Sequence, residues 1–185
     1  MIIGLTGQTG TGKSTLAKAF SKKGFLVFDA DYEYKLLLEN NLEMQEKIKE
    51  VFKSLDRKTI LQSVSKDKRL LKELNKISHY YVRLKLDEFI ENNPDNNIVL
   101  DVPIPVEEGF MDRCDLVIVT VCNKDIQIKR LLERYKTTKE EIIERINLQD
   151  SYDFYIKKGD IIINTDKTDM KDLNSIVSVI NNTYI

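Results

Sequence analysis

A short glycine-rich segment near the start of the chain limits its fold more than any other feature. Residues 7–14 read GQTGTGKS and match the pattern G-x-x-x-x-G-K-[ST] at every fixed position. The segment follows an apolar run at residues 2–5 and opens a helical pattern that reaches about Lys23, just before Gly24. This order predicts a phosphate-binding loop, because glycines let backbone N–H groups converge on phosphate oxygens at a helix N-terminus. A glycine-rich turn without a ligand is the alternative.

The loop also predicts how a nucleoside triphosphate would be held. We expect Lys13 to reach the β- and γ-phosphates and Ser14 to hold Mg²⁺ through its hydroxyl. Asp101 ends the apolar run NIVLD, where a carboxylate can reach the magnesium shell; a loop or cap carboxylate is the alternative. The ATP-binding residues predicted in the loop are Gly10, Thr11, Gly12, Lys13, Ser14 and Thr15.

Apolar runs separated by helical patterns predict the rest of the fold. Such runs occur at residues 2–5, 25–28, 98–100, 116–121 and 161–163. They indicate βαβ units and a parallel sheet, so we expect an α/β protein with the three-layer fold of P-loop NTPases and five parallel strands. A single domain is expected, with its core at about 1–30, 96–123 and 151–185, a helical acceptor-binding insert at about 31–95 and a helical lid at about 124–150.

The expected insert contains one clear helix at about 67–92. Its apolar stripe is formed by Leu70, Leu74, Ile77, Tyr81 and Leu84. A polar row of Asn75, His79 and Arg83 lies roughly opposite this stripe. The row could line a substrate groove or form a solvated face, and the helical pattern alone favours neither.

Two helices, at 124–135 and 139–150, are expected after the fourth strand, and a last helix at about 169–182. Thr138 and Glu141 form a capping-box pattern at the start of the second. A helical hairpin here suits a mobile lid, whose guanidinium groups could close over phosphates. Arg130 and Arg134 sit one turn apart on one face. Ordinary surface ion pairs are the alternative use of these arginines.

Composition excludes several classes of protein. The 185 residues include 29 Lys and Arg against 30 Asp and Glu, a net charge of −1, which argues against a general nucleic-acid binder. The apolar stretches are far shorter than the roughly 18 residues of a membrane span. Cys114 and Cys122 are too few for a disulfide framework. Because MIIGLTG enters a strand without a charged leader, we expect no secretory signal and a cytoplasmic protein.

The loop does not name the reaction. A GTPase is disfavoured, because Asp125 directly follows Lys124 and DVPIP replaces the expected D-x-x-G after the third strand. Phosphoryl transfer to an alcohol needs a group that orients the hydroxyl and accepts its proton. Asp29 and Asp31 end the second strand, at the edge of the sheet where the ligand would bind. We assign the base to Asp31 and a structural role to Asp29, with capping of the next helix as the alternative for Asp31.

Together these motifs resemble those of the dephospho-CoA kinase family, whose members phosphorylate the 3′-hydroxyl of dephospho-CoA with ATP. The resemblance covers nearly the whole chain. It rests on the order and spacing of the segments IGLTGQTGTGKST, VFDADYEYK, DVPIPVEE, QIKRLLERYKTTKEEIIERINLQ and GDIIINTD. Within the lid segment Gln127, Arg130, Arg134, Arg145, Ile146 and Gln149 match the family pattern, and Asn164 matches in the last strand.

The resemblance implies roles for individual residues. The implied catalytic residues are Asp31, Lys13 and Arg134, and Arg130 and Arg145 are implied to bind ATP. Ser14 and Asp101 would hold the cofactor Mg²⁺. The implied substrate-binding residues are Thr6, Asp31, Lys35, Arg57, His79, Arg83, Pro103 and Glu107.

Three positions depart from the family pattern. Lys35 stands in place of the usual arginine, Tyr80 follows His79 in place of proline, and Pro105 replaces a leucine. The stretch leading to SLDRKTIL is also shorter than usual and lacks an Asp-Gly turn. This shortened stretch and Tyr80 fall where the pantetheine arm of the substrate would bind.

ATP and dephospho-CoA are the expected partners, with no nucleic acid and no membrane, and we expect a monomer with a weak oligomer as the alternative. Another P-loop small-molecule or nucleotide kinase is the rival enzyme. An ATP-binding regulatory module is the rival of a different class, but a module that only changes shape needs neither a base nor lid arginines.

Overall fold

The chain divides into two compact units. The computed structural model describes residues 1–102 and 110–184, with only the backbone described at Arg57, Lys68 and Met111. We call Met1–Asp29 with Asp95–Ile185 the sheet unit, and Ala30–Pro94 the helical unit. Among the described residues, no helix combines the length and the apolar character needed to cross a membrane.

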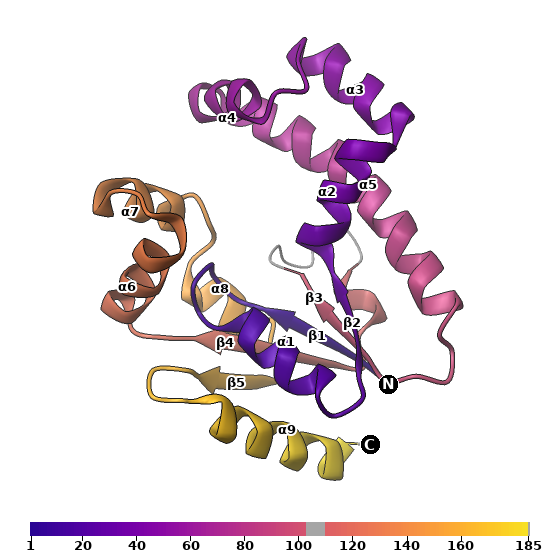
Figure 1. Ribbon diagram of the computed structural model, residues 1–185, viewed down its shortest axis with the longest axis vertical. Helices are drawn as coiled ribbons and strands as arrows, with labels where there is room; N and C mark the ends of the chain where they lie inside the picture. Colours follow the sequence, from indigo (N-terminus) through magenta and orange to yellow (C-terminus); the bar gives the residue numbers. More distant parts are fainter. Residues whose placement is uncertain (103–109, 185) are drawn as a thin grey trace. The chain divides into compact units, whose positions relative to one another are not determined.

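The sheet unit is built on five parallel strands in the order β2-β3-β1-β4-β5 (Figure 1). All five strands occur where the apolar runs predicted them, so the predicted α/β fold with a parallel sheet is confirmed. Their carboxyl ends meet at one edge, where the loop after β1 lies between the ends of β3 and β4. The strands are β1 (Ile2–Thr6), β2 (Leu26–Asp29), β3 (Ile98–Asp101), β4 (Leu116–Val121) and β5 (Ile161–Asn164).

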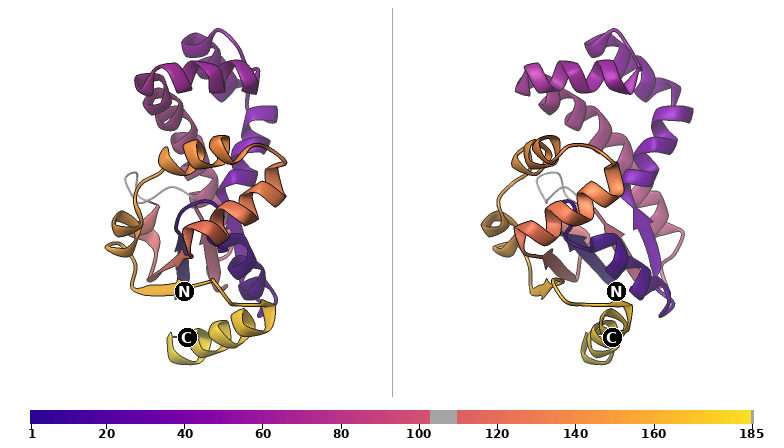
Figure 2. Two further views of the ribbon diagram at one scale, coloured as in Figure 1. Left: turned by 90° about the vertical axis from the view of Figure 1, so that its left-hand side faces the viewer. Right: turned by 60° about the vertical axis from the view of Figure 1, so that its left-hand side comes forward.

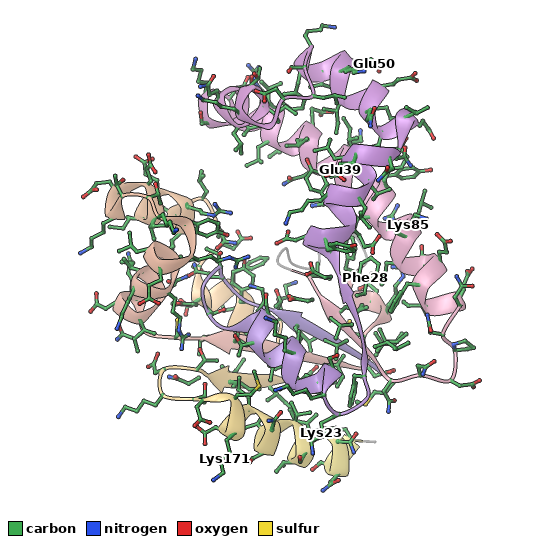
Figure 3. All side chains as sticks on the ribbon, viewed as in Figure 1. Lys23, Phe28, Glu39, Glu50, Lys85 and Lys171 are labelled. Carbon is green, nitrogen blue, oxygen red and sulfur yellow. The ribbon has the colours of Figure 1, made fainter. Side chains whose placement is uncertain are left out.

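One face of the sheet is covered by α1 (Lys13–Ser21) and α9 (Met170–Tyr184), which pack against each other (Figure 1). Apolar side chains from both helices and from the strands form one core, while charged side chains such as Lys171 point away from it (Figure 3). A short helix that the sequence did not predict, α8 (Tyr152–Ile156), packs against β4. The first helix was predicted to reach about Lys23, whereas α1 ends at Ser21.

Two helices follow β4 and form a small core of their own. They are α6 (Lys124–Tyr135) and α7 (Lys139–Asn147), the adjoining coral and orange helices in Figure 2. The side chain of Thr138 accepts a hydrogen bond from the Glu141 amide, as the capping pattern predicts. The second helix ends three residues before its predicted end at 150. The core between them contains Ile128, Leu131, Ile142 and Ile146.

The helical unit consists of four helices among its described residues, and the longest packs against the other three. Side-chain oxygens of Asn41, Asp56 and Asp67 cap three of the four N-termini. The predicted helix at 67–92 is confirmed by α5. The four helices are α2 (Ala30–Asn40), α3 (Leu42–Phe52), α4 (Arg57–Lys66) and α5 (Lys68–Glu91).

The apolar stripe predicted on α5 is wrong at one position. Leu84 is 49% exposed, whereas Ser78, Tyr81, Val82 and Leu86 are buried. These four follow one another at intervals of three, one and four residues, which keeps them on one helical face. Leu84 lies two residues beyond Val82 and therefore points away from that face.

Candidate active site

The loop after β1 adopts a shape that only glycine permits at several positions. The φ angles of Gly7, Gly10 and Gly12 are 132°, 79° and 97°. A Cβ at Gly7 would lie 2.4 Å from the backbone oxygen of Thr120, and one at Gly10 would lie 2.8 Å from Leu131. Both the backbone conformation and the surrounding atoms therefore exclude larger residues.

The loop leads directly into the N-terminus of α1. Gly12 occupies the N-cap position in the left-handed conformation, and no side chain caps the helix. The positive end of the helix dipole is therefore open to an anion. Ser14 and Thr15 are exposed in this first turn. This is the geometry of a phosphate-binding site.

Lys13 is enclosed by the loop that it follows. Its ammonium nitrogen donates to the backbone oxygens of Gly7 at 2.6 Å and of Gln8 at 3.0 Å, and the residue is only 8% exposed. The lysine is therefore buried within the loop and not exposed to solvent. The positive-φ glycines turn the loop carbonyls toward the ammonium, which keeps the charge solvated by hydrogen bonds.

The side chain of Thr11 holds the loop to the sheet. Its hydroxyl bonds to the Gln8 backbone oxygen and to the Thr120 hydroxyl, both at 2.7 Å, and the residue is fully buried. The hydroxyl of Thr165, just after β5, donates to the Thr11 backbone oxygen at 2.7 Å. The Thr11 backbone N–H also donates to the Gln8 backbone oxygen, at 3.4 Å, so Thr11 fixes the shape of the loop.

Two carboxylates lie side by side at the carboxyl edge of the sheet. Asp29 of β2 is in register with Asp101 of β3, which is itself in register with Leu5 of β1. Side chains two residues apart share a strand face, so Asp101 lies on the same face as Val99, within the core shared with α1. The buried Asp101 carboxylate is therefore on the side of the sheet where Ser14 opens α1.

These residues suit a magnesium ion. Mg²⁺ takes oxygen ligands and usually keeps several waters, so one hydroxyl and one carboxylate besides the phosphates are sufficient. Ser14 and Asp101 supply such oxygens on one face of the sheet. Within the described ranges, no three His, Cys, Asp or Glu side chains form a ready metal cluster, and a P-loop magnesium site requires none.

The lid arginines separate into two groups. Arg130 donates to the hydroxyl of Thr165 at 3.0 Å and to its backbone oxygen at 2.7 Å, which ties α6 to the loop after β5. Arg134 and Arg145, by contrast, are exposed and place their guanidinium carbons 5.2 Å and 4.3 Å from the centre of the Tyr135 ring. Tyr135 therefore gathers two cations from two helices.

The residues predicted to bind the acceptor lie mostly in the helical unit. Asp31 and Lys35 are exposed on α2, and His79 and Arg83 are half-buried one turn apart on α5. Half-burial of this pair argues against the fully solvated face. Pro103, Glu107 and the side chain of Arg57 lie outside the described residues.

Two further positions bear on the acceptor site. Because α2 begins at Ala30, Asp31 lies inside its first turn and not at the N-cap position, which weakens the capping alternative. Thr6, at the end of β1, is fully buried, and among the described residues its hydroxyl has no hydrogen-bond partner.

Sequence reasoning assigned no role to several polar residues around the loop. Gln8, Gln127, Gln149 and Tyr152 form hydrogen bonds to the loop or to one another, and they border an open hollow of about 440 Å³. Burial raises the pKa of the Tyr152 phenol, so it remains a donor at neutral pH, and it bonds to the Cys122 backbone oxygen at 2.9 Å. In the sequence, only the match of Gln127 and Gln149 to the family's lid pattern could have pointed to these residues.

Curated relatives resemble the chain over nearly its full length. A protein of Fusobacterium nucleatum named dephospho-CoA kinase is 35% identical over 180 residues, which cover 94% of this chain and 93% of the relative. A dephospho-CoA kinase of Bacillus licheniformis is 34% identical, with 88% of this chain and 87% of the relative covered.

Solved structures and a family model extend the comparison. A Thermus thermophilus structure has a TM-score of 0.84 at 25% identity and covers 100% of this chain and 98% of its own. The dephospho-CoA kinase structure from Campylobacter jejuni has a TM-score of 0.66 at 26% identity, covering 98% and 95%. The dephospho-CoA kinase family model matches residues 1–171. The chain belongs to the dephospho-CoA kinase family.

Proposed function

We propose that the protein transfers the γ-phosphoryl group of ATP to the ribose 3′-hydroxyl of dephospho-CoA, which gives coenzyme A in the last step of its biosynthesis. The observation that carries this function is the family match over residues 1–171, which includes the complete phosphate-binding loop. The products are ADP, coenzyme A and one proton.

The sheet unit would bind the donor. Backbone N–H groups of the loop and the first turn of α1 would bind the β- and γ-phosphates. On phosphate binding, the Lys13 ammonium would exchange the Gly7 and Gln8 carbonyls for phosphate oxygens, a rearrangement of one flexible side chain. Mg²⁺, held by Ser14 and Asp101, would offset negative charge on the phosphates.

The lid would complete the donor site. Arg134 and Arg145 are exposed guanidinium groups that could close over the phosphates, where charge spreads over the oxygens of the transferred group. Arg130 would contribute from the base of the lid, where it already binds the loop after β5. We therefore propose that residues of about 124–150 form a lid.

We assign the proton transfer to Asp31. The hydroxyl oxygen of the acceptor attacks the γ-phosphorus, the bond to the β-phosphate oxygen breaks, and the hydroxyl proton passes to the Asp31 carboxylate. The position of Asp31 inside the first turn of α2, with its side chain exposed, supports this role. Asp29 would support the turn from β2 into α2.

The acceptor contacts are proposed from the resemblance to the family pattern. The proposed contacts are Thr6, Asp31, Lys35, Arg57, His79, Arg83, Pro103 and Glu107. Basic side chains in this set suit the phosphates of dephospho-CoA. We propose a monomer that acts in the cytoplasm, where its two small-molecule substrates occur.

The test is ADP release measured with a panel of acceptors. With Mg²⁺ and ATP, dephospho-CoA should support turnover far above that of nucleoside monophosphates or shikimate. Mass spectrometry of the product should show one added phosphate on the ribose. Equal or faster turnover with another acceptor would assign the chain a different substrate, and hydrolysis of ATP without any acceptor dependence would oppose the kinase assignment.

A further inference from the structure

Two glutamines from opposite ends of the proposed lid bind the backbone of the same residue in the phosphate-binding loop. Gln127, in α6, donates through Nε2 to the Thr9 backbone oxygen at 2.7 Å. Gln149, just after α7, accepts through Oε1 from the Thr9 backbone nitrogen at 2.8 Å. Thr9 is at the middle of the loop, so both of its backbone polar groups are bound by the segment that folds over it.

The backbone determines which way each glutamine is turned. The Thr9 carbonyl can only accept, so it must face the Gln127 amide nitrogen, and the Thr9 N–H can only donate, so it must face the Gln149 oxygen. One position therefore needs a donor and the other needs an acceptor. Because the two requirements differ, substitutions at the two positions can distinguish the effect of hydrogen bonding from the effects of side-chain size and charge.

Further bonds fix Gln127 in place. The residue is fully buried, and its Nε2 lies 3.2 Å from Oε1 of Gln8. Its own Oε1 lies 3.2 Å from the Tyr152 hydroxyl, whose single proton is shared with the Cys122 backbone oxygen at 2.9 Å. Gln8 in turn donates to the Asp150 backbone oxygen at 2.8 Å. A buried side-chain amide with all these partners is held in a single orientation.

The lid helices cannot move far without affecting this arrangement. Ile128, beside Gln127, and Ile146, near Gln149, belong to one apolar core that joins α6 to α7. The two glutamines are therefore carried by one packed body. Any tilt of that body strains the two bonds to Thr9, and any shift of Thr9 acts on both helices.

We propose that Gln127 and Gln149 are positioning residues that hold the loop in its phosphate-binding shape and couple it to the lid. This rests on the proposed ATP site. The two bonds keep the peptide units on both sides of Thr9, and with them the N–H groups of the loop, in place before the nucleotide binds. Binding energy then need not be spent on ordering the loop. The coupling predicts effects on nucleotide affinity and little effect on the acceptor.

The sharpest test compares Gln127→Glu with Gln149→Glu. Each places one carboxylate beside Thr9, so any general effect of charge on the phosphates is shared. A carboxylate can still accept from the Thr9 N–H at position 149 but cannot donate to the Thr9 carbonyl at position 127. We expect Gln127→Glu to raise the Kd for ADP and the KM for ATP about tenfold more than Gln149→Glu does.

Three further variants complete the test. Gln149→Leu should speed hydrogen exchange of the Thr9 amide, whereas Gln149→Glu should preserve its protection. Glu140→Gln, an exposed change on α7, is the surface control. Gln127→Met removes the donor without adding charge and serves if Gln127→Glu unfolds, as judged by circular dichroism. The KM for dephospho-CoA should stay within about twofold in every variant.

The outcomes are distinct. Equal effects of the two glutamates on ADP affinity, or no effect from Gln127→Met, would overturn the positioning role. A rise in the KM for dephospho-CoA as large as that for ATP would indicate general damage and oppose it too. Because ADP binding and amide exchange need no acceptor, they are readable even if dephospho-CoA proves to be the wrong substrate.

Discussion

The guanidinium carbon of Arg145 lies 4.3 Å from the centre of the Tyr135 ring, within cation–π distance. Arg134 approaches the same ring at 5.2 Å. The electron-rich ring attracts both positive charges and so offsets part of their mutual repulsion. Tyr135 therefore holds two arginines of the proposed lid close together.

This arrangement predicts a difference between two substitutions at Tyr135. Tyr135→Phe keeps the aromatic face and should leave kcat/KM for ATP within about twofold, whereas Tyr135→Leu removes the face and should lower it about three- to tenfold. Steady-state kinetics with varied ATP would measure both. Equal losses would point to the phenol or to packing as the cause, and not to the ring face.

Lys13→Ala should abolish phosphoryl transfer. The substitution removes the ammonium expected to stabilise the transferred phosphoryl group, and we expect turnover to fall at least about 10²–10³-fold. The fold should survive, because Lys13 directly follows the loop and lies outside the apolar core formed by the strands, α1 and α9. Circular dichroism checks folding, and Lys18→Ala on the exposed side of α1 is the matched control. Near-normal turnover of Lys13→Ala would contradict a role of the loop in catalysis.

Asp31→Asn should lower kcat by about 10²–10⁴-fold while nucleotide binding barely changes. Asparagine keeps the shape of the side chain and could still serve a helix N-terminus, but it cannot accept the hydroxyl proton. Assays should hold ATP, Mg²⁺ and dephospho-CoA constant. Asp29→Asn is the control and should leave the chemical step mostly intact. Turnover of Asp31→Asn within a few-fold of the unchanged protein would reassign the base.

A non-hydrolysable ATP analogue should slow amide exchange across residues 124–150. Closure would bury the hairpin and place its arginines on the phosphates. Hydrogen exchange followed by mass spectrometry resolves the segment, and α9, which packs on α1 away from the lid helices, is an internal reference that should not change. Identical exchange with and without the analogue would leave the arginines as surface charges.

Asp56, the N-cap residue of α4, should have a pKa below the usual value for an aspartate. Hydrogen bonds from the Thr59 side chain and backbone lower the pKa of Asp56 from its usual value of 3.8. The stabilisation is therefore present above about pH 4 and is lost as the pH falls through the lowered pKa. Carbon-13 NMR should show this pKa rising in Thr59→Ala and unchanged in Ser65→Ala. A pKa at or above 3.8 in the unchanged protein would contradict the cap.

Local patterns in the sequence were sufficient to predict the main elements. Each strand appears as a short apolar run, and the glycine-rich loop has its own spacing, so both are encoded within a few neighbouring residues. The long helix α5 was predicted to within a residue at each end. The short helix α8 was missed, because five residues carry too little periodicity to detect. The division of the insert before α5 into three helices was missed as well.

The tertiary structure decided how the site is held together. The sequence determined that a loop, a lysine, carboxylates and lid arginines exist, in an order typical of one family. It could not show that the Lys13 ammonium is enclosed by its own loop, or that Tyr135 gathers two arginines. Nor could it pair Thr9 with Gln149, which are 140 residues apart in the chain. Such partners follow from packing between distant elements, whereas periodicity and turn chemistry act only between neighbours.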